Sequence, residues 1–210
     1  MKIAFIGYRS WASRIFENLT EVISSNWQIV DPSEADIILY YGWSWKIPKE
    51  IYEKKLCLIL HTSPLPKYRG GSPLQHQIIN GNKMSAVTIL KAEKEIDTGD
   101  IYSQSYFSLE GSLEDIFDSI VEVGTKDTIT VLDEIKNGIA QPIKQDESQA
   151  TYYKRRKEEE SEITFLDLET KGARQLYNFI RALADPYPNA YIKCVDGKKL
   201  YITGAKLEQD

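Results

Sequence analysis

One stretch decides the fold and also holds the first candidate for chemistry: residues 56–73, which run LCLILHTSPLPKYRGGSP. Its first residues are apolar up to His61, a pattern typical of a strand buried in a sheet. The prolines that follow stiffen the backbone, whereas Gly70 and Gly71 permit conformations and close approaches that other residues do not. The sequence therefore predicts a strand over 56–61 that leads into a loop built to fit a ligand.

Short apolar runs alternate with helical periodicity on both sides of this stretch. Strands are expected at 2–7, 28–30, 36–41, 56–61, 85–92 and 100–108. Helices are expected at about 11–24, from Pro48, from Pro73 with Ser72 as its N-cap, and at 112–137. This alternation predicts an α/β fold with a mostly parallel, Rossmann-like sheet.

The C-terminal part is expected to form a small region of its own. Residues 144–162 are polar and unperiodic, which indicates a boundary between a domain of residues 1–145 and a subdomain of residues 146–210. In the latter, Thr170 is expected to cap a helix that runs to about Ala184. Asp196 and Gly197 predict a hairpin turn between apolar runs at 191–195 and 199–202. The edge of that hairpin could pair with a second copy, so a homodimer is one expectation.

The bulk composition excludes several classes of protein. The chain has 210 residues and a net charge of −5, which argues against a nucleic-acid binder because such proteins carry a basic surface. No apolar run approaches the roughly 20 residues that span a bilayer. The chain begins on a predicted strand rather than a signal peptide, so a cytoplasmic location is expected. No metal-site spacing is present.

Two further features concern polar residues near predicted strand ends. The turn after the first strand, Gly7-Tyr8-Arg9-Ser10, lacks the later glycines of a dinucleotide-binding loop, although Arg9 and Ser10 could meet a phosphate or a sugar at the helix start. The stretch Ile96-Asp97-Thr98-Gly99-Asp100-Ile101 favours a turn. Asp97 is also a carboxylate that could orient His61, whose imidazole is suited to proton transfer near neutral pH. For His61 the alternative is a core histidine bonded to backbone.

These motifs resemble those of one family. The pattern HxSxLPxxRGxxP over residues 61–73, then Val87-Thr88-Ile89, then DTGDI over 97–101 is similar to the folate-dependent formyltransferases. The likeness runs from about Ile37 to Gln104. A second one, over 153–157 and 180–190, resembles the branch that acts on nucleotide sugars, such as UDP-linked 4-amino-4,6-dideoxy-N-acetylhexosamines in pathways related to pseudaminic acid. The resemblance implies N10-formyltetrahydrofolate as the formyl donor, a nucleotide-linked amino sugar as the acceptor, and no metal.

The resemblance also implies roles for single residues. His61 would act as a general base that Asp97 orients. The residues expected to bind the folate are Tyr41, Trp43, Trp45, Ile59, Ile96 and Asp97. The residues expected to bind the acceptor are Arg9, Ser10, Lys67, Arg69, Gly70, Gly71, Tyr153, Arg155 and Arg156.

One departure from the family pattern leaves the activity open. The family has an asparagine two residues before the histidine, where its amide stabilises the developing oxyanion, and this chain has Ile59 there. Loss of one such donor costs about 10²–10³ in rate. Three alternatives to a sugar N-formyltransferase therefore stand: a glycinamide ribonucleotide formyltransferase, a formyl-folate hydrolase that shares the site, and a protein that binds folate or nucleotide sugar without catalysis.

Overall fold

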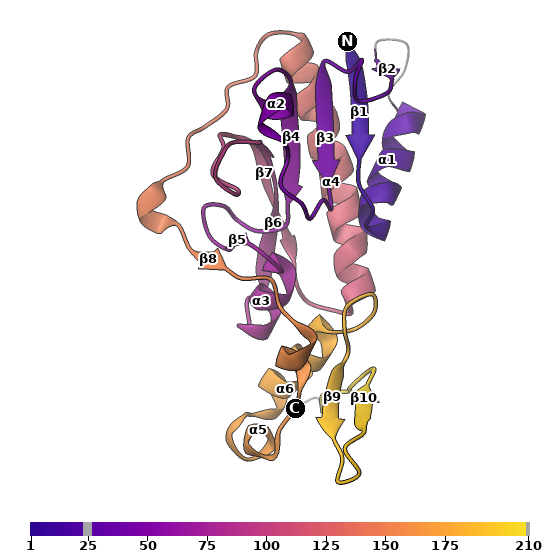
Figure 1. Ribbon diagram of the computed structural model, residues 1–210, viewed down its shortest axis with the longest axis vertical. Helices are drawn as coiled ribbons and strands as arrows, with labels where there is room; N and C mark the ends of the chain where they lie inside the picture. The colour runs from indigo at the N-terminus through magenta and orange to yellow at the C-terminus, as the bar shows by residue number, and fades with distance from the viewer. Residues whose placement is uncertain (23–26, 209–210) are drawn as a thin grey trace.

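The strands of the N-terminal part form one twisted sheet (Figure 1). Within residues 1–22 and 27–208, which the computed structural model describes, this sheet has six strands in the order β2-β1-β3-β4-β6-β7. Their bounds are β1 Lys2–Ile6, β2 Gln28–Ile29, β3 Ile37–Tyr41, β4 Leu56–His61, β6 Met84–Lys91 and β7 Ile101–Ser108. All pairs from β2 to β4 are parallel, and only β6 runs against its neighbours. The predicted α/β fold with a mostly parallel sheet is confirmed.

The two faces of the sheet are covered differently. Helices α1 (Ser10–Val22) and α4 (Leu113–Lys136) pack against one face, where Leu58 and Leu60 of β4 join the larger core. Cys57 and Ile59 belong to the smaller core on the opposite face, beside the short helix α2 (Lys49–Tyr52). Because side chains alternate along a strand, His61 at the end of β4 lies on the same face as Ile59.

The helix ends test the predicted capping residues. Ser112 caps α4 as expected, since its hydroxyl accepts a hydrogen bond from Asp115 N and the Asp115 carboxylate accepts one from Ser112 N. Ser72 precedes α3 (Pro73–Ile79), but it has a left-handed backbone with φ 53° and its hydroxyl accepts from Arg156 N at 3.1 Å instead of capping the helix. The expected capping role of Ser72 is therefore wrong. The predicted end of the first helix, residues 23–24, lies outside the described residues.

The C-terminal lobe contains two helices and a hairpin in its described residues (Figure 1, orange to yellow). These are α5 (Phe165–Thr170), α6 (Ala173–Ala182), β9 (Ala190–Lys193) and β10 (Lys199–Ile202), and the antiparallel hairpin is confirmed. The expected helix capped by Thr170 is wrong, because Thr170 ends α5 and Gly172 precedes α6. The capping box of α5, Thr164 with Asp167, is a sequence signal that could have separated the two helices.

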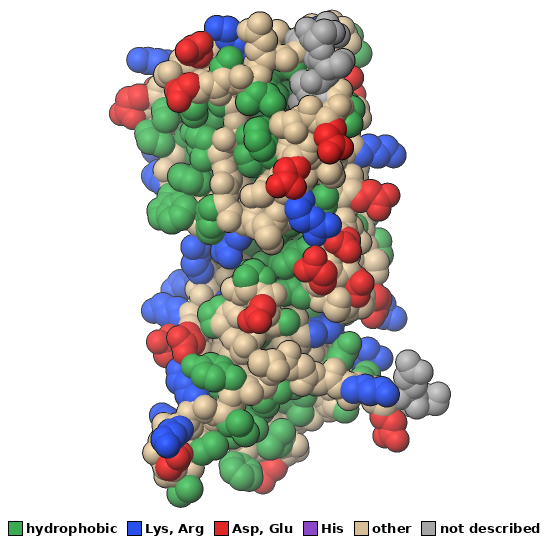
Figure 2. Space-filling model, turned by 90° about the vertical axis from the view of Figure 1, so that its right-hand side faces the viewer, with side chains coloured by type: hydrophobic (Ala, Val, Ile, Leu, Met, Phe, Trp, Pro, Cys, Tyr) green, Lys and Arg blue, Asp and Glu red, His purple; other side chains and the backbone are tan. Residues whose placement is uncertain are grey.

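The lobe has a small core that rests on the N-terminal part. Ile163, Phe179, Leu183 and Ala190 form this core, and Ile79 of α3 packs against it. Hydrophobic side chains remain exposed on the outside of the lobe, in the lower part of Figure 2. Pairing of a second copy with the hairpin edge stays a prediction. No helix among the described residues is long and apolar enough to cross a membrane.

The segment that follows α4, residues 143–157, runs along the sheet before it enters the lobe. It contains β8 (Tyr152–Tyr153), which pairs with β5 (Arg69–Gly70) of the predicted loop. A Cβ atom on Gly70 would lie 2.4 Å from Tyr153 O, and one on Gly71 would lie 2.3 Å from Arg155 N. The two glycines therefore let this connecting segment lie directly on the loop, and the close approach expected of them is to the chain itself.

Replacement of Gly71 by alanine should loosen the connecting segment, because the new methyl group meets the backbone of Arg155. We expect trypsin to cut within residues 154–157 about tenfold faster than in the wild type, which corresponds to roughly 1.4 kcal/mol of weakened packing. Limited proteolysis followed by mass spectrometry measures this rate. Gly204→Ala is the matched control, since a Cβ there meets nothing within 4 Å. Equal cleavage in both variants would contradict the expected contact.

Candidate active site

His61 and Asp97 lie side by side although they are far apart in the sequence. His61 Nδ1 is 3.5 Å from Asp97 Oδ2, and His61 Nε2 is 2.9 Å from Tyr68 O. Both side chains are about 8% exposed. Both neighbours of the ring are acceptors, so a neutral imidazole donates to one of them and a protonated imidazole to both. The distance at Nδ1 exceeds a normal hydrogen bond, which leaves this nitrogen able to exchange a proton.

The position of Asp97 depends on an uncommon backbone conformation. Its φ is 57°, in the left-handed region that aspartate tolerates better than most residues. In this conformation its Oδ2 accepts a hydrogen bond from Gly70 N at 2.8 Å, and its own carbonyl accepts one from Gln145 Nε2 at 2.8 Å. Asp97 is therefore both a turn residue and a partner of His61.

A cavity of about 460 Å³ opens on one side of His61. Three aromatic rings line it, Tyr40, Trp43 and Trp45, and the ring centroids of the two tryptophans are 4.7 Å apart. Burial raises the pKa of Tyr40 to about 12, so its hydroxyl stays neutral. Apolar side chains complete the wall: Ile47, Ile59 and Ile96. Such flat and apolar walls suit a flat heterocyclic ligand.

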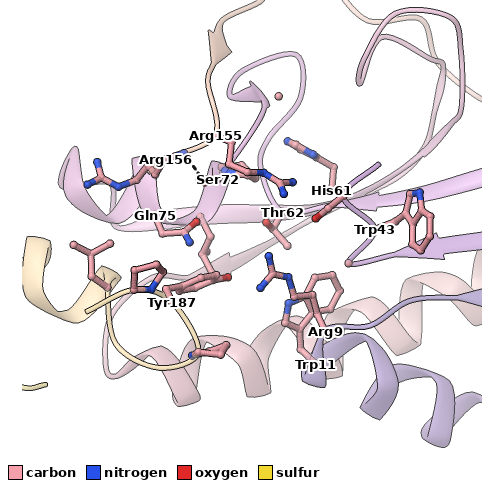
Figure 3. Close-up of a pocket in the computed structure, with 18 of the residues that line it drawn as sticks. Arg9, Trp11, Trp43, His61, Thr62, Ser72, Gln75, Arg155, Arg156 and Tyr187 are labelled. Atoms are coloured by element: carbon pink, nitrogen blue, oxygen red, sulfur yellow. Dashed lines mark hydrogen bonds between the residues drawn. The ribbon is translucent and has the colours of Figure 1, made fainter. Parts of the chain in front are cut away.

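A second cavity, of about 290 Å³, opens on the other side of His61, between the sheet and the C-terminal lobe (Figure 3). The charged residues that line it are Arg9, Arg155, Arg156 and Lys157, and no Asp or Glu is among the described residues of its wall. Acidic and basic side chains are mixed on the outer face of the molecule (Figure 2), so this concentration of positive charge is local.

Two of these arginines are held by their surroundings. Arg9 lies against the ring of Tyr187, with its Cζ 5.6 Å from the ring centroid. Burial raises the pKa of Tyr187 to about 12, so the hydroxyl adds no negative charge. Arg156 donates to Glu160 O, its Nε has no partner among the described residues, and burial lowers its pKa from the ordinary value. A buried cation with an unused donor favours an anionic ligand in this cavity.

Most of the predicted binding residues lie on these two cavities. Trp43, Trp45, Ile59, Ile96 and Asp97 line the larger cavity together with Gly71 and Tyr153, whereas Arg9 and Arg156 line the smaller one. Six residues line both: Trp43, Ser44, Leu60, His61, Gly70 and Arg155.

Four predicted binding residues lie on neither cavity. Tyr41 is buried in the core, where its hydroxyl bonds to Thr128 Oγ1 at 2.8 Å, because it points to the face opposite Tyr40. Arg69 is fully buried and donates to Gln145 and Glu147, and the hydrogen bond to Glu147 raises its pKa. Ser10 and Lys67 are exposed.

Several lining residues are absent from the sequence-based list. Thr62, Gln75, Lys157 and Tyr187 line the smaller cavity, and the loop of residues 92–95 lines the larger one. Tyr187 lies in the stretch DPYPNA that already carried the resemblance, so this motif could have indicated it. Gln75 follows two residues after Pro73 on α3 and gives no local signal of its own.

Family models match most of the chain. The model "Formyl transferase" matches residues 3–132, and the model "Formyl transferase, C-terminal domain" matches residues 157–210. The boundary predicted at residue 145 falls between the two matches.

Individual relatives agree with these matches. The methionyl-tRNA formyltransferase of Lachnospira eligens is 35% identical over 178 residues, which cover 81% of this chain and 54% of the relative. This chain thus spans about half the length of that relative. The structure of methionyl-tRNA formyltransferase from Clostridium thermocellum has a TM-score of 0.79 at 31% identity and covers 96% of this chain and 97% of its own.

A third similar structure contains a folate. HypX from Aquifex aeolicus in complex with tetrahydrofolic acid has a TM-score of 0.77 at 25% identity, over 95% of this chain and 36% of its own. Because the N-terminal family model alone matches more than half of the residues, the chain belongs to the formyl transferase family.

Proposed function

We propose that this protein transfers a formyl group from N10-formyltetrahydrofolate to the amine of a nucleotide-linked amino-deoxy sugar. One observation carries this proposal: His61 lines both cavities, with Asp97 beside its ring. Acyl transfer between two molecules needs a proton acceptor at their meeting point, and the imidazole occupies that place.

The larger cavity is the proposed site of the folate. Its aromatic and apolar walls match the flat pterin ring, and its volume of about 460 Å³ lies within the range of small-molecule sites. The bound donor would supply the formyl carbon, with its pterin among Trp43, Ile59 and the loop of residues 92–97. The tetrahydrofolate reported in the structure of HypX supports a folate as the ligand class.

In the proposed reaction the residues of this chain bind, orient and move a proton. The acceptor attacks as a free amine, and its nitrogen bonds to the formyl carbon. His61 takes the proton that the amine loses and can return it to N10 as that nitrogen leaves. Asp97 fixes the ring and stabilises its protonated form. The two cavities hold the reactants against each other, which supplies much of the remaining acceleration.

The smaller cavity is the proposed site of the acceptor. Its four cations suit a phosphate, for which the arginine fork is well shaped. A volume of about 290 Å³ holds an amino sugar and the adjoining phosphate rather than a whole nucleotide. The base of the nucleotide would therefore extend along the connecting segment toward the surface.

A second acceptor, methionyl-tRNA, is favoured by a different observation. The relatives with 31% and 35% identity are methionyl-tRNA formyltransferases. Both acceptors carry an amine and a phosphate, so the charge of the cavity does not choose between them. The net charge of −5 disfavours a large polyanion.

The test of the function is a parallel assay of acceptors. The full chain is incubated with N10-formyltetrahydrofolate and, separately, with UDP- and dTDP-linked 4-amino sugars, methionyl-tRNA and glycinamide ribonucleotide. We expect a gain of one formyl group, by mass spectrometry, on an amino sugar. Formylated methionyl-tRNA as the main product would replace the sugar by the second acceptor. Formate release without an acceptor would indicate a hydrolase, and folate binding without turnover would exclude catalysis.

The roles of His61 and Asp97 predict a large effect on turnover. His61→Asn and Asp97→Asn should each lower kcat by about 10² or more, because each removes the proton acceptor or its orienting charge. Steady-state assays with the acceptor found above measure kcat. Asp133→Asn, an exposed residue of α4 outside both cavities, is the control. Near-normal rates in both active-site variants would refute the assigned roles.

The charge of the smaller cavity predicts a specific effect on the acceptor. Arg9→Gln and Arg156→Gln should each raise the KM of the acceptor about tenfold, the equivalent of about 1.4 kcal/mol for one lost charge-assisted hydrogen bond. The Kd of tetrahydrofolate, measured through the fluorescence of Trp43 and Trp45, should stay the same. Arg174→Gln, on the exposed side of α6, is the matched control. An unchanged KM would remove the acceptor from this cavity.

A further inference from the structure

Formyl transfer creates a negative charge that some group must stabilise. When the amine nitrogen bonds to the formyl carbon, the π electrons of the carbonyl move to its oxygen, which becomes an oxyanion. A donor aimed at this oxygen contributes about 3–4 kcal/mol to the transition state. Ile59 lies on the same face of β4 as His61 and lines the folate cavity, but its side chain has no donor. Another group must act at this position.

The candidates are the side chains and backbone groups that line both cavities. Gly70 N already donates to Asp97, and the hydroxyl of Ser44 is hydrogen-bonded to Tyr8. Leu60 has no polar side chain, and His61 is assigned to the proton. Two donors remain: the indole N–H of Trp43 and the guanidinium of Arg155. Of these, only Arg155 carries a charge, and charge-assisted hydrogen bonds to an anion are the stronger kind.

Arg155 is placed and free to take this role. Its backbone is fixed against Gly71, where a Cβ atom would lie 2.4 Å from Arg155 Cα. Its guanidinium has no hydrogen bond or ion pair among the residues that the structure describes. In Figure 3 the side chain of Arg155 extends toward the part of the cavity that His61 borders, whereas that of Arg156 points the opposite way. Neighbouring arginines of the connecting segment thus face different parts of the site.

We propose that Arg155 is a catalytic residue that donates hydrogen bonds to the formyl oxyanion, at the place where Ile59 offers none. This inference rests on the proposed function. In the step, the new C–N bond forms as the carbonyl π pair moves onto oxygen, next to the guanidinium. The pair returns as the C–N10 bond breaks, and N10 takes the proton that the amine gave to His61. Arg155 itself gains and loses no proton.

The test is a double-mutant cycle between Arg155 and Ile59. Arg155→Gln should lower kcat about 10²-fold, and Arg155→Lys should lower it less because the charge remains. Ile59→Asn places an amide on the wall of the folate cavity, on the same face as His61. We expect this substitution to restore at least about tenfold of the rate in the Arg155→Gln background, and far less in the wild type. Formate release without acceptor, in which water creates the same oxyanion, should follow the same pattern.

Binding measurements separate this role from a structural or acceptor-binding one. The Kd of tetrahydrofolate, by tryptophan fluorescence, should be equal in the wild type and in Arg155→Gln, because the guanidinium acts on charge that only the transition state carries. A higher acceptor KM with unchanged kcat, or no rescue by Ile59→Asn, would overturn the proposal while leaving the formyltransferase intact. A loss in Trp43→Phe that Ile59→Asn rescues would assign the role to the indole. Absence of turnover in the wild type would overturn the proposed function and this role with it.

Discussion

The carboxylate of Asp97 is the point on which the arrangement of the site depends. One oxygen, Oδ2, accepts the N–H of Gly70 and faces Nδ1 of His61, so a single group ties together the end of β4, the loop at β5 and the turn before β7. The hydrogen bond to Gly70 also sets the register in which β8 pairs with β5. The cations of the connecting segment reach the smaller cavity only because that pairing holds.

The positions of the central strands followed from the sequence because a buried sheet leaves a strong local pattern. The face of a residue within a strand follows from the same pattern when it is applied. Tyr41 was expected to bind folate, yet the alternation of side chains sends Tyr41 to the core and Tyr40 to the cavity. Ser72 failed as a cap because its hydroxyl accepts from the connecting segment, whose approach no local pattern reveals.

Contacts between distant segments were beyond local analysis of the sequence. Arg69 was expected to grip a phosphate, but its partners Gln145 and Glu147 lie 76 and 78 residues further along the chain. They turn an apparent binding residue into a buried link between the loop and the connecting segment. The pair of His61 and Asp97 was indicated only by the likeness to a family, since periodicity says nothing about which side chains meet. The net charge of the chain was a similarly coarse guide, because the cations of one cavity outweigh it locally.

The six residues common to both cavities have a consequence for how the two ligands meet. With only side chains such as His61 and Arg155 at the border, a donor and an acceptor that fill the cavities touch each other directly. A group handed across such a border passes from one molecule to the next without a covalent stop on the chain. Both ligands must then be present together, and the cavity that empties sooner decides the order in which the products leave.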